Sequence, residues 1–424
     1  MVMRGLHKRQ QESARNARVI KIMVIGICVC LAFVGGFLIR GEHNLLNNLG
    51  LGFLNTSGEE TTQQTGSLVP KDGELSLRVA EIEALLQSES LYEYDVDEAT
   101  DLVLAAYTDV TKDEYLRYYD QARYAVYVFE SSGKQNGVGV LFSEYKGSAY
   151  AVDVFPESAA AVAGVRQGDF VVAINDDRTQ KWTLTEAVNA LSNDEGETVK
   201  VTWRRPTSLE AAGGDEFVTS LVFSKITEQN VSHELVDNVG YITLKQLTQN
   251  SADLVKEAIT TLTSQGAKSF VLDIRDNPGG YLTQAVDVAS LFVRSGIIVV
   301  IETKSDHDST KTATGSVVTD KPLVVLVNGN TAAAAEVIAA SLKDSGRATV
   351  VGSTTIGKGS VQVVRPLSFG GALRYTAAFY KSPNGQSING MGVTPNLAVA
   401  NSASSTVDSQ KNQAIETAQS LVSE

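Results

Sequence analysis

Along the chain, apolar residues follow several spacings, and each spacing predicts a different kind of structure. An apolar run without charges covers residues 22–39, long enough for a slightly short membrane-spanning helix. Helical spacing of Leu and Val dominates residues 75–125. From residue 136 onward, short β-branched runs are broken by glycine, and from residue 227 such runs alternate with amphipathic helices. The pattern therefore predicts a membrane segment, a helical region, a β-rich domain and an α/β domain.

The α/β region is predicted from seven apolar runs. These are strands at 240–244 and 269–274, helices at 252–262 and 285–292, and the β-rich runs GIIVVIE, PLVVLVN and ATVVG. Strands that alternate with helices favour an α/β layer structure in which ligands bind near strand ends.

Basic residues precede the apolar segment 22–39 and set its expected orientation. Residues 1–40 hold seven of the 36 Lys and Arg but one of the 49 Asp and Glu. Such an arm predicts a cytoplasmic N-terminus. A cleaved signal peptide is the competing interpretation, but FVGGFLIRGEHN offers no good small-x-small cleavage site. We therefore expect a retained single-pass anchor in the cell membrane, with the body of the protein extracytoplasmic.

The composition of the body limits its partners and its chemistry. A length of 424 residues with 43% hydrophobic and 20% charged residues is that of a globular protein with two or three domains. Residues 41–424 carry 29 Lys and Arg against 48 Asp and Glu, and this acidity argues against nucleic acid as a partner. Both cysteines, Cys28 and Cys30, lie in the apolar segment, so we expect neither a disulfide nor a thiol nucleophile in the body.

The β-rich region, residues 136–223, contains two glycine motifs followed by a helix. NGVGV precedes a predicted strand, and AG-x3-GD-x-V-x-x-x-N follows it. Thr183 and Glu186 have the spacing of a capping box, and the buried stripe of that helix is predicted at Leu184, Val188 and Leu191. This order of motifs resembles a PDZ domain.

The PDZ resemblance implies a peptide-binding site on the first glycine motif. Backbone N–H groups of the loop formed by Gly137, Val138, Gly139 and Val140 would bind a terminal carboxylate. The peptide would then add as a strand beside residues 140–142. Taken alone, the glycines could instead serve only to permit a tight turn.

Two strand ends in the α/β region carry groups suited to acyl transfer. LDIRDNPGG, residues 272–280, places glycines directly after a buried strand, where backbone N–H groups can face a cleft as an oxyanion site requires. A simple strand-to-helix turn is the alternative. Residues 331–336 begin a helix of small residues, with free N–H donors near Ala333 and Ala334.

Lys358 lies between two glycines and two β-rich runs. A lysine that acts as a general base must be buried so that it is neutral near pH 7, whereas a solvated loop lysine is the ordinary alternative. Residues 352–358 also match the first seven positions of a phosphate-binding P-loop. The eighth position is Gly359 instead of Ser or Thr, and the alternating SVQVV that follows predicts a strand where a P-loop has a helix.

Four motifs in order, LDIRDNPGG, VNGNTAAAAEVIAASLKDSGRA, GKGSVQ and YKSPNGQSINGMGVTP, resemble the carboxy-terminal processing peptidases, also called tail-specific proteases. The resemblance covers about residues 113–399, PDZ region included. It implies a membrane-anchored or exported serine endopeptidase that recognises C-terminal segments and uses neither metal nor cofactor. It also implies an α/β fold with a ClpP/crotonase-like layered core and an inserted PDZ domain.

With this resemblance, the expected organisation has seven parts. They are a cytoplasmic basic arm at 1–21, a transmembrane anchor at 22–39, a linker at 40–74, an N-terminal helical region at 75–135, a PDZ domain at 136–226, a peptidase core at 227–400 and a C-terminal tail or helix at 401–424. The expected partners are protein substrates with exposed C-terminal tails, with a homodimer or an activating partner possible.

The resemblance also assigns roles to single residues. Lys358 matches the general base, Gln362 the residue that orients it, and the backbones of Gly279 and Ala334 match the oxyanion donors. The family's nucleophilic serine falls on Ala333, and a methyl group cannot attack a carbonyl.

Neighbouring hydroxyls do not replace the missing serine. Thr331 is two positions too early, and Ser341 is roughly 12 Å further along the helix. Two hypotheses remain: an inactivated copy of a protease, or a natural pseudoprotease that binds tails or acts as a scaffold. In either case, the chain as written is expected to bind and not to cut.

Overall fold

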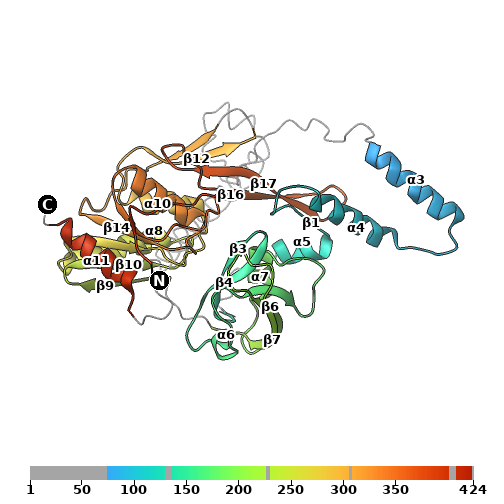
Figure 1. The fold of residues 1–424 in the computed structure, drawn as a ribbon, viewed down its shortest axis with the longest axis horizontal. Coiled ribbons are helices and arrows are strands. Elements are labelled where there is room, and N and C mark those ends of the chain that lie inside the picture. Colours follow the sequence, from blue (N-terminus) through green and yellow to red (C-terminus); the bar gives the residue numbers. More distant parts are fainter. Residues whose placement is uncertain (1–73, 129–135, 226–229, 305–307, 401–406, 423–424) are drawn as a thin grey trace, which may run out of the picture. The chain divides into compact units, whose positions relative to one another are not determined.

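A computed structural model describes residues 74–128, 136–225, 230–304, 308–400 and 407–422 of the chain (Figure 1). The predicted membrane segment at 22–39 lies outside these residues. Within the described part, none of the helices has both the length and the apolar character needed to span a bilayer. The described residues belong to two units, one that ends at residue 93 and one that begins at residue 94.

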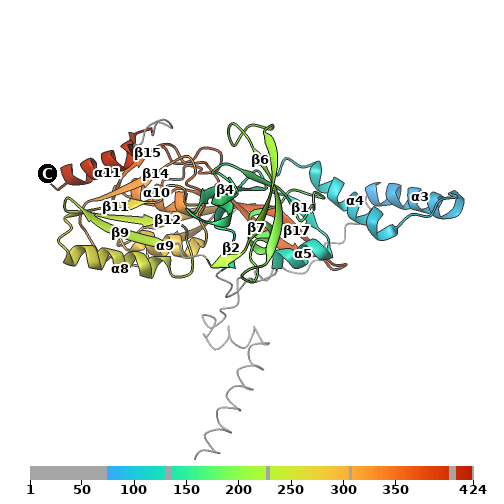
Figure 2. The same ribbon diagram turned by 90° about the horizontal axis from the view of Figure 1, so that it is seen from below.

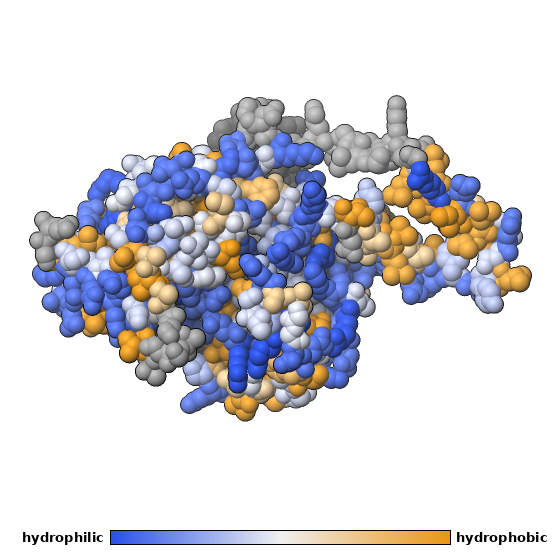
Figure 3. Space-filling view, viewed as in Figure 1, coloured by the Kyte–Doolittle hydropathy of each residue, from blue (hydrophilic) through white to orange (hydrophobic). Residues whose placement is uncertain are grey.

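The described part of the first unit, residues 74–93, contains one helix, α3 (Glu74–Glu89). The helical spacing predicted for this stretch is confirmed, and its apolar residues are not buried against other described residues. Apolar side chains along α3 are 37% to 61% exposed and form much of its surface in Figure 3. They are Leu75, Leu77, Val79, Ile82, Leu85 and Leu86. Periodicity predicts an amphipathic helix, but it does not identify what covers the apolar face.

The second unit begins with α4 (Val96–Asp109), β1 (Arg117–Tyr119) and α5 (Gln121–Val128). The prediction of helix through residue 125 is therefore wrong at β1. This strand pairs antiparallel with residues 372–374, about 250 positions later in the chain, and Tyr119 is fully buried. A strand of three residues is too short to show the alternation of apolar and polar residues that identifies a strand, and its pairing partner lies far away in the sequence.

The PDZ-like region is an antiparallel sheet with strand order β3-β4-β5-β6-β7. Its strands are β3 (Val140–Tyr145), β4 (Ser148–Val154), β5 (Phe170–Ile174), β6 (Thr198–Arg205) and β7 (Asp215–Val222); the short helices are α6 (Ala159–Val162) and α7 (Leu184–Ala190), and β2 (Asn136–Gly137) pairs with β8 (Ser224–Lys225). Its core surrounds the fully buried Trp203.

Helix α7 has the predicted start, and its predicted buried stripe is confirmed at Leu184 and Leu191 but wrong at Val188. Glu186 accepts a hydrogen bond from the backbone of Thr183 at 3.1 Å, as the capping box requires. Ala187 and Leu191 are buried, whereas Val188 is 39% exposed and Leu184 is partly exposed. Leu184, Ala187 and Leu191 share the face of α7 that packs against the core, and Val188 lies outside this face.

The α/β region contains a six-stranded sheet with strand order β18-β15-β14-β11-β10-β9. Its strands are β9 (Val231–Val236), β10 (Val239–Leu244), β11 (Ser269–Asp273), β14 (Leu323–Val327), β15 (Thr349–Gly352) and β18 (Leu397–Ala398), all parallel except the β9–β10 pair. The predicted strands and their alternation with helices are confirmed.

Helices cover both faces of this sheet (Figures 1 and 2). On one face lie α8 (Ser251–Ser264), α9 (Leu282–Ser290) and α10 (Ala334–Asp344), and on the other lies α11 (Ser409–Ser420). Alternate strand residues face opposite layers: Leu272 packs under α8 and α9, while Val271 packs under α11. The result is a helix–sheet–helix arrangement with one buried apolar cluster on each face of the sheet. A ClpP/crotonase relationship remains a prediction.

A second, antiparallel sheet lies beside this core. Its strands are β1, β17 (Ala372–Lys381), β12 (Ile297–Thr303) and β13 (Ser309–Thr312), in that order, with β16 (Ser360–Pro366) also paired to β17. The strand at β16 follows Lys358 directly, so no helix begins where a P-loop requires one. The P-loop interpretation is thereby excluded.

Candidate active site

Ala333 forms a sharp turn between β14 and α10. Its backbone has φ 52° and ψ −120°, a combination that residues with a Cβ atom rarely adopt. Strain of this kind costs on the order of 1–3 kcal/mol and persists only where the surroundings enforce it. Here the Ala332 N–H donates to the Asn277 carbonyl at 2.9 Å, and the Ala333 N–H donates to Glu336 Oε2 at 2.9 Å. The predicted nucleophile position is therefore a strained elbow at a helix start.

The two predicted oxyanion donors lie on either side of this elbow. α10 begins at Ala334, and the N–H of this residue has no acceptor within the described part of the chain. Gly279 approaches so closely that a Cβ atom there would lie 3.1 Å from the Ala333 Cβ and 2.9 Å from the Ala332 carbonyl oxygen. The NPGG loop thus needs glycine at 279 for close approach, and the structure brings together Gly279, Ala333 and Ala334 as predicted.

The Gly279 N–H is not free in this structure. It donates to Asn277 Oδ1 at 2.8 Å, while the Asn277 amide donates to the Leu244 carbonyl at 2.9 Å. Asn277 is fully buried. For Gly279 to act as an oxyanion donor, its N–H must exchange the Asn277 side chain for a substrate oxygen.

Asp276, at the start of the same loop, was not singled out by the sequence motifs. It has φ 57°, and its Oδ1 accepts side-chain amides from Asn330 at 2.8 Å and Asn328 at 3.0 Å. A third amide, from Gln167 of the PDZ-like region, donates to the same oxygen at 2.7 Å. The loop that carries Gly279 is therefore fixed both to the elbow segment and to the PDZ-like region.

Lys358 is buried, so the alternative of a solvated loop lysine is wrong. Its side chain is 9% exposed, and burial lowers the pKa of its ammonium group. Glu144 opposes this shift, and Arg374 adds to it. A lysine with a lowered pKa is suited to act as a general base.

Lys358 contacts a partner that the sequence did not reveal. Its Nζ lies 3.9 Å from Oε2 of Glu144, on strand β3 of the PDZ-like sheet. Glu144 is 2% exposed, and each of its two carboxylate oxygens accepts a hydrogen bond from Arg374 Nη2, at 2.8 and 3.0 Å. Burial alone raises the pKa of Glu144, but the cations of Lys358 and Arg374 bring it below its ordinary value. A buried ionic cluster therefore joins the PDZ-like sheet to the predicted base.

Gln362 does not hydrogen-bond to Lys358 in this structure, although the sequence resemblance predicts that it orients the lysine. Its Nε2 donates to Ser360 Oγ at 2.9 Å. Residues 360 and 362 share one face of β16, so the amide reaches the nearer hydroxyl. Lys358 precedes this strand and turns toward Glu144 instead.

Glu336 connects the elbow to the lysine loop. Its Oε2 accepts the N–H groups of Ala333 and Lys358, both at 2.9 Å, and its Oε1 accepts the Gly357 N–H at 2.8 Å and the Thr355 hydroxyl at 2.5 Å. The backbone N–H groups of Ala333 and Lys358 therefore donate to the same oxygen atom, which holds the elbow and the lysine loop close together. Sequence reasoning assigned no role to Glu336. The sequence feature that could have indicated this role is an acidic residue three positions after Ala333.

Glu336 predicts a dependence of folding on pH. Burial raises its pKa from 4.5 to about 7, against four hydrogen bonds that each lower it. Below pH 4.5 the group is protonated in both states; between 4.5 and 7 the unfolded chain ionises while the folded chain keeps its proton. The free energy of unfolding should therefore fall by about 3 kcal/mol as pH rises through this window. Urea unfolding from pH 4.5 to 7.5 measures it, and Glu336→Gln should remove this slope; an unchanged slope would contradict the assignment.

Glu144→Gln is expected to destabilise the fold by about 3 kcal/mol, because it leaves Arg374 and Lys358 buried without a counter-charge. Denaturant unfolding at pH 7 measures the change. The matched control is Glu114→Gln, whose pair with Lys146 is half exposed and should matter by less than about 1 kcal/mol. Equal effects at both positions would show that the cluster is not held together by charge.

The predicted peptide groove has an open strand edge. Among the described strands, β3 pairs only with β4. Helix α7 lies alongside, and its Leu184 N–H donates to Glu144 at 3.3 Å. Gly139 has φ 81°, and a Cβ there would lie 2.0 Å from the Ser158 Cβ, so the turn requires glycine. Gly137 belongs to β2 instead of to the loop, but the N–H groups of Val138 and Gly139 have no acceptor among the described residues. These donors and the open edge of β3 suit a peptide terminus.

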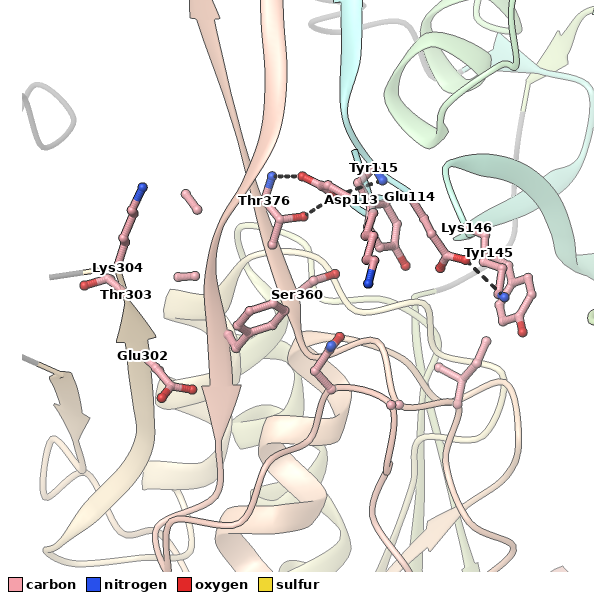
Figure 4. Close-up of a pocket in the computed structure, with 18 of the residues that line it drawn as sticks. Asp113, Glu114, Tyr115, Tyr145, Lys146, Glu302, Thr303, Lys304, Ser360 and Thr376 are labelled. Atoms are coloured by element: carbon pink, nitrogen blue, oxygen red, sulfur yellow. Dashed lines mark hydrogen bonds and ion pairs between the residues drawn. The ribbon is translucent and has the colours of Figure 1, made fainter. Parts of the chain in front are cut away.

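A cleft of about 890 Å³ lies beside the lysine loop (Figure 4). Ile356, Gly357 and Ser360 line it next to Lys358. Figure 4 shows Tyr145 and Lys146 on one wall, and Glu302, Thr303 and Lys304 on the opposite wall. Its size is sufficient for a segment of polypeptide.

Parts of the chain are similar to known protein families. Residues 238–399 match Peptidase family S41, and residues 150–205 match the PDZ domain. The chain is 34% identical to the carboxy-terminal-processing protease of Bartonella bacilliformis over 63% of this chain and 62% of that one. It is 33% identical to the carboxyl-terminal-processing protease of Picosynechococcus sp., over 68% and 70%, and 29% identical to the carboxy-terminal processing protease CtpA of Bacillus subtilis, over 74% and 66%.

A solved structure agrees with these matches. The photosystem II D1 C-terminal processing protease superposes with a TM-score of 0.62 at 29% identity, over 75% of this chain and 85% of that one. The fold and the site thus define a serine peptidase scaffold with a PDZ domain. The chain belongs to the S41 family of carboxy-terminal processing proteases, and it spans 62% to 70% of the length of the three relatives above.

Proposed function

We propose that this chain is the scaffold of a membrane-anchored, extracytoplasmic serine endopeptidase that reads substrate C-termini with its PDZ domain and cleaves with a Ser/Lys dyad. Ala333 occupies the nucleophile position, so the chain as written binds without cutting. One observation carries the proposal: the strained elbow at Ala333 is joined through Glu336 to the loop of the buried Lys358. The anchor at residues 22–39 is proposed from sequence alone.

With serine at 333, the residues present supply each step of acyl transfer. Neutral Lys358 accepts the hydroxyl proton as the oxygen attacks the scissile carbonyl. The Gly279 and Ala334 N–H groups stabilise the oxyanion, the amine leaves with the proton, and water hydrolyses the acyl-enzyme. Two contacts must first change: Lys358 must leave Glu144, and the Gly279 N–H must leave Asn277.

Two hypotheses for Ala333 remain, and they belong to different functional classes. A natural pseudoprotease that binds tails or acts as a scaffold is supported by Ala333 itself. An inactivated copy of a protease is supported by the cost of what remains, because a buried lysine and a strained elbow both lower stability and serve no purpose in a binding module. The test is whether the Ala333→Ser chain cleaves a protein substrate. Cleavage would support the proposal and favour the hypothesis of an inactivated copy.

Amidating the C-terminus of a peptide ligand is expected to weaken its binding to the chain as written by roughly tenfold or more, since it removes a charge-assisted bond to backbone N–H groups. Fluorescence anisotropy with matched acid and amide peptides measures this. The same peptide with one further residue at its N-terminus serves as the control. Equal affinity of acid and amide would remove the carboxylate role of Val138 and Gly139.

A further inference from the structure

We infer that Arg374, on strand β17, is a positioning residue for the proposed base: it binds the carboxylate of Glu144, so that Lys358 is left as a neutral amine able to receive a proton. This inference rests on the proposed function and adds to it the residue that keeps the base ready. No sequence motif gave Arg374 a role. The argument for one comes from the charges buried around Lys358.

Two basic side chains compete for one carboxylate in this cluster. Arg374 Nη2 donates to both oxygens of Glu144, at 2.8 and 3.0 Å. Lys358 Nζ lies 3.9 Å from the nearer of these oxygens, which is too far for a hydrogen bond. All three side chains are buried, with exposures of 9% or less. The arginine therefore binds the carboxylate, and the lysine lies beside this pair without bonding to it.

The count of charges decides which group gives up its proton. A guanidinium stays protonated at any ordinary pH, whereas a buried lysine loses its proton readily. A second buried cation without a counter-charge is strongly unfavourable. Arg374 Nη1 is itself buried and has no hydrogen-bond acceptor among the described residues, so the cluster already lacks acceptors. The favoured state has Arg374 and Glu144 ionised and Lys358 neutral.

The neighbours of Lys358 affect its pKa in the directions that this state requires. Burial lowers the pKa of Lys358, and the carboxylate of Glu144 opposes this shift. The guanidinium of Arg374 lowers the pKa again by repulsion. Loss of Arg374 would therefore raise the pKa of Lys358 for two reasons, because the repulsion disappears and because Glu144 becomes available to the lysine.

Three tyrosines also face the two cations but carry no charge at neutral pH. The ring centroid of Tyr115 lies 5.8 Å from Lys358 Nζ and 5.8 Å from Arg374 Cζ. Burial raises the pKa of Tyr115 to about 12. Burial also raises the pKa of Tyr119 and of Tyr127, both of which act on Arg374. The tyrosines thus exclude water from the cluster without supplying a counter-charge.

Glu336, on α10, is the remaining acid that faces Lys358, and it raises the pKa of the lysine less than Glu144 does. Burial raises the pKa of Glu336 itself to about 7. Its titration therefore falls in the range where a base of lowered pKa is active. Because Glu336 is kept in every variant below, differences between the variants report on Arg374 and Glu144 alone.

The positions of the two basic residues in the fold suit these separate tasks. β17 lies between β1 and β16, where Arg374 is paired with Arg117 on one side and Val364 on the other. Its guanidinium is therefore fixed in place beside Glu144. Lys358 precedes β16, and its Nζ has no hydrogen-bond acceptor among the described residues. The lysine consequently loses no hydrogen bond from Nζ when it turns toward the elbow.

The first test measures the pH profile of kcat/KM in the Ala333→Ser chain with Arg374→Gln, with Glu144→Gln and with both changes. Arg374→Gln should reduce kcat/KM at pH 7 roughly tenfold or more and regain it at higher pH, as the rising limb moves up by about one pH unit or more. Glu144→Gln should move the limb to lower pH, and the double variant should lie between the two. Arg374→Lys keeps a cation and should move the limb less than Arg374→Gln.

The matched control is Arg178→Gln, which breaks an exposed arginine–glutamate pair with Glu216 in the PDZ-like region. It should leave the limb in place. A limb that stays in place with Arg374→Gln, or that moves in the same direction with Glu144→Gln, would overturn the inference. Activity lost equally at every pH would show that Arg374 only supports the fold.

The second test titrates Lys358 directly in the chain as written and needs no catalysis. Lysines are labelled with carbon-13 at Cε, and the Lys358 signal is identified by its absence from the Lys358→Arg chain. Its chemical shift should titrate at lower pH than the signals of exposed lysines, at higher pH after Arg374→Gln or Arg374→Lys, and at still lower pH after Glu144→Gln.

The two tests separate the inference from the proposed function. If the Ala333→Ser chain cuts nothing, the proposed function fails, and the Lys358 titration still decides how its charge is set. If that chain cuts but Lys358 titrates together with the exposed lysines, the proposed function stands and the inference fails. Should Arg374→Gln not fold, the opposite displacements expected from Arg374→Lys and Glu144→Gln decide the case, and displacements in one direction would overturn it.

Discussion

The Ala333→Ser chain is expected to hydrolyse an unstructured protein that the chain as written leaves intact, with a rate higher by a factor on the order of 10⁴ to 10⁶, as nucleophile removal costs in serine hydrolases. The reason is geometric. The elbow already holds residue 333 beside the Ala334 N–H and within contact of the NPGG loop, and Glu336 ties it to the lysine loop. One hydroxyl is the missing part. Time-resolved gel assays or a quenched fluorescent substrate measure the rate.

Two variants make this result specific. Ala333→Ser combined with Lys358→Ala should lose most of the gained activity, on the order of 10²-fold to 10⁴-fold, because the general base is absent. Ala340→Ser changes another buried alanine of α10 and should give no activity. If all three chains are inert, the endopeptidase proposal fails and the pseudoprotease is favoured. If the chain as written cuts as well as Ala333→Ser, the nucleophile is assigned to the wrong residue.

Glu336→Gln is expected to lower the free energy of unfolding by about 3 kcal/mol at pH below 5 and to reduce the activity of the Ala333→Ser chain at least 100-fold. Below pH 5 the side chain is a neutral carboxylic acid, whose two oxygens can both still accept hydrogen bonds. The amide of glutamine keeps one acceptor oxygen but turns an NH₂ group, which accepts none, toward two of the four donors around it. Two buried donors lose their acceptor, and either the strained elbow or the lysine loop is released. Urea unfolding and the fluorescent assay measure the two effects on the same samples.

The control for this substitution is Glu234→Gln, which removes an exposed pair with Lys411. It should change stability by less than about 1 kcal/mol and leave activity unchanged. If Glu336→Gln destabilises the fold while the activity per folded molecule is retained, Glu336 supports the structure without positioning the site. If neither property changes, its four hydrogen bonds do not hold the elbow.

Much of the fold and part of the site could be predicted because the signals are local. Strand β11, helix α8 and the capping box at Thr183 follow from periodicity and spacing within a few residues. Gly279, Ala333, Ala334 and Lys358 follow from motifs whose order matches one family. Strand β1 and the exposure of Val188 did not follow, because one depends on a partner strand about 250 residues away and the other on which face of a short helix meets the core.

By itself, the sequence determined the family and most of the succession of strands and helices, and it predicted Ala333 as the position of the nucleophile. Each of these is written in residues that are neighbours in the chain. The tertiary structure alone decided what surrounds Lys358: Glu144 from one sheet, Arg374 from another, and the Glu336 carboxylate that binds elbow and loop together. Charges cluster in this way only when the fold excludes water and brings distant residues within a few ångströms, which no spacing along the chain can specify.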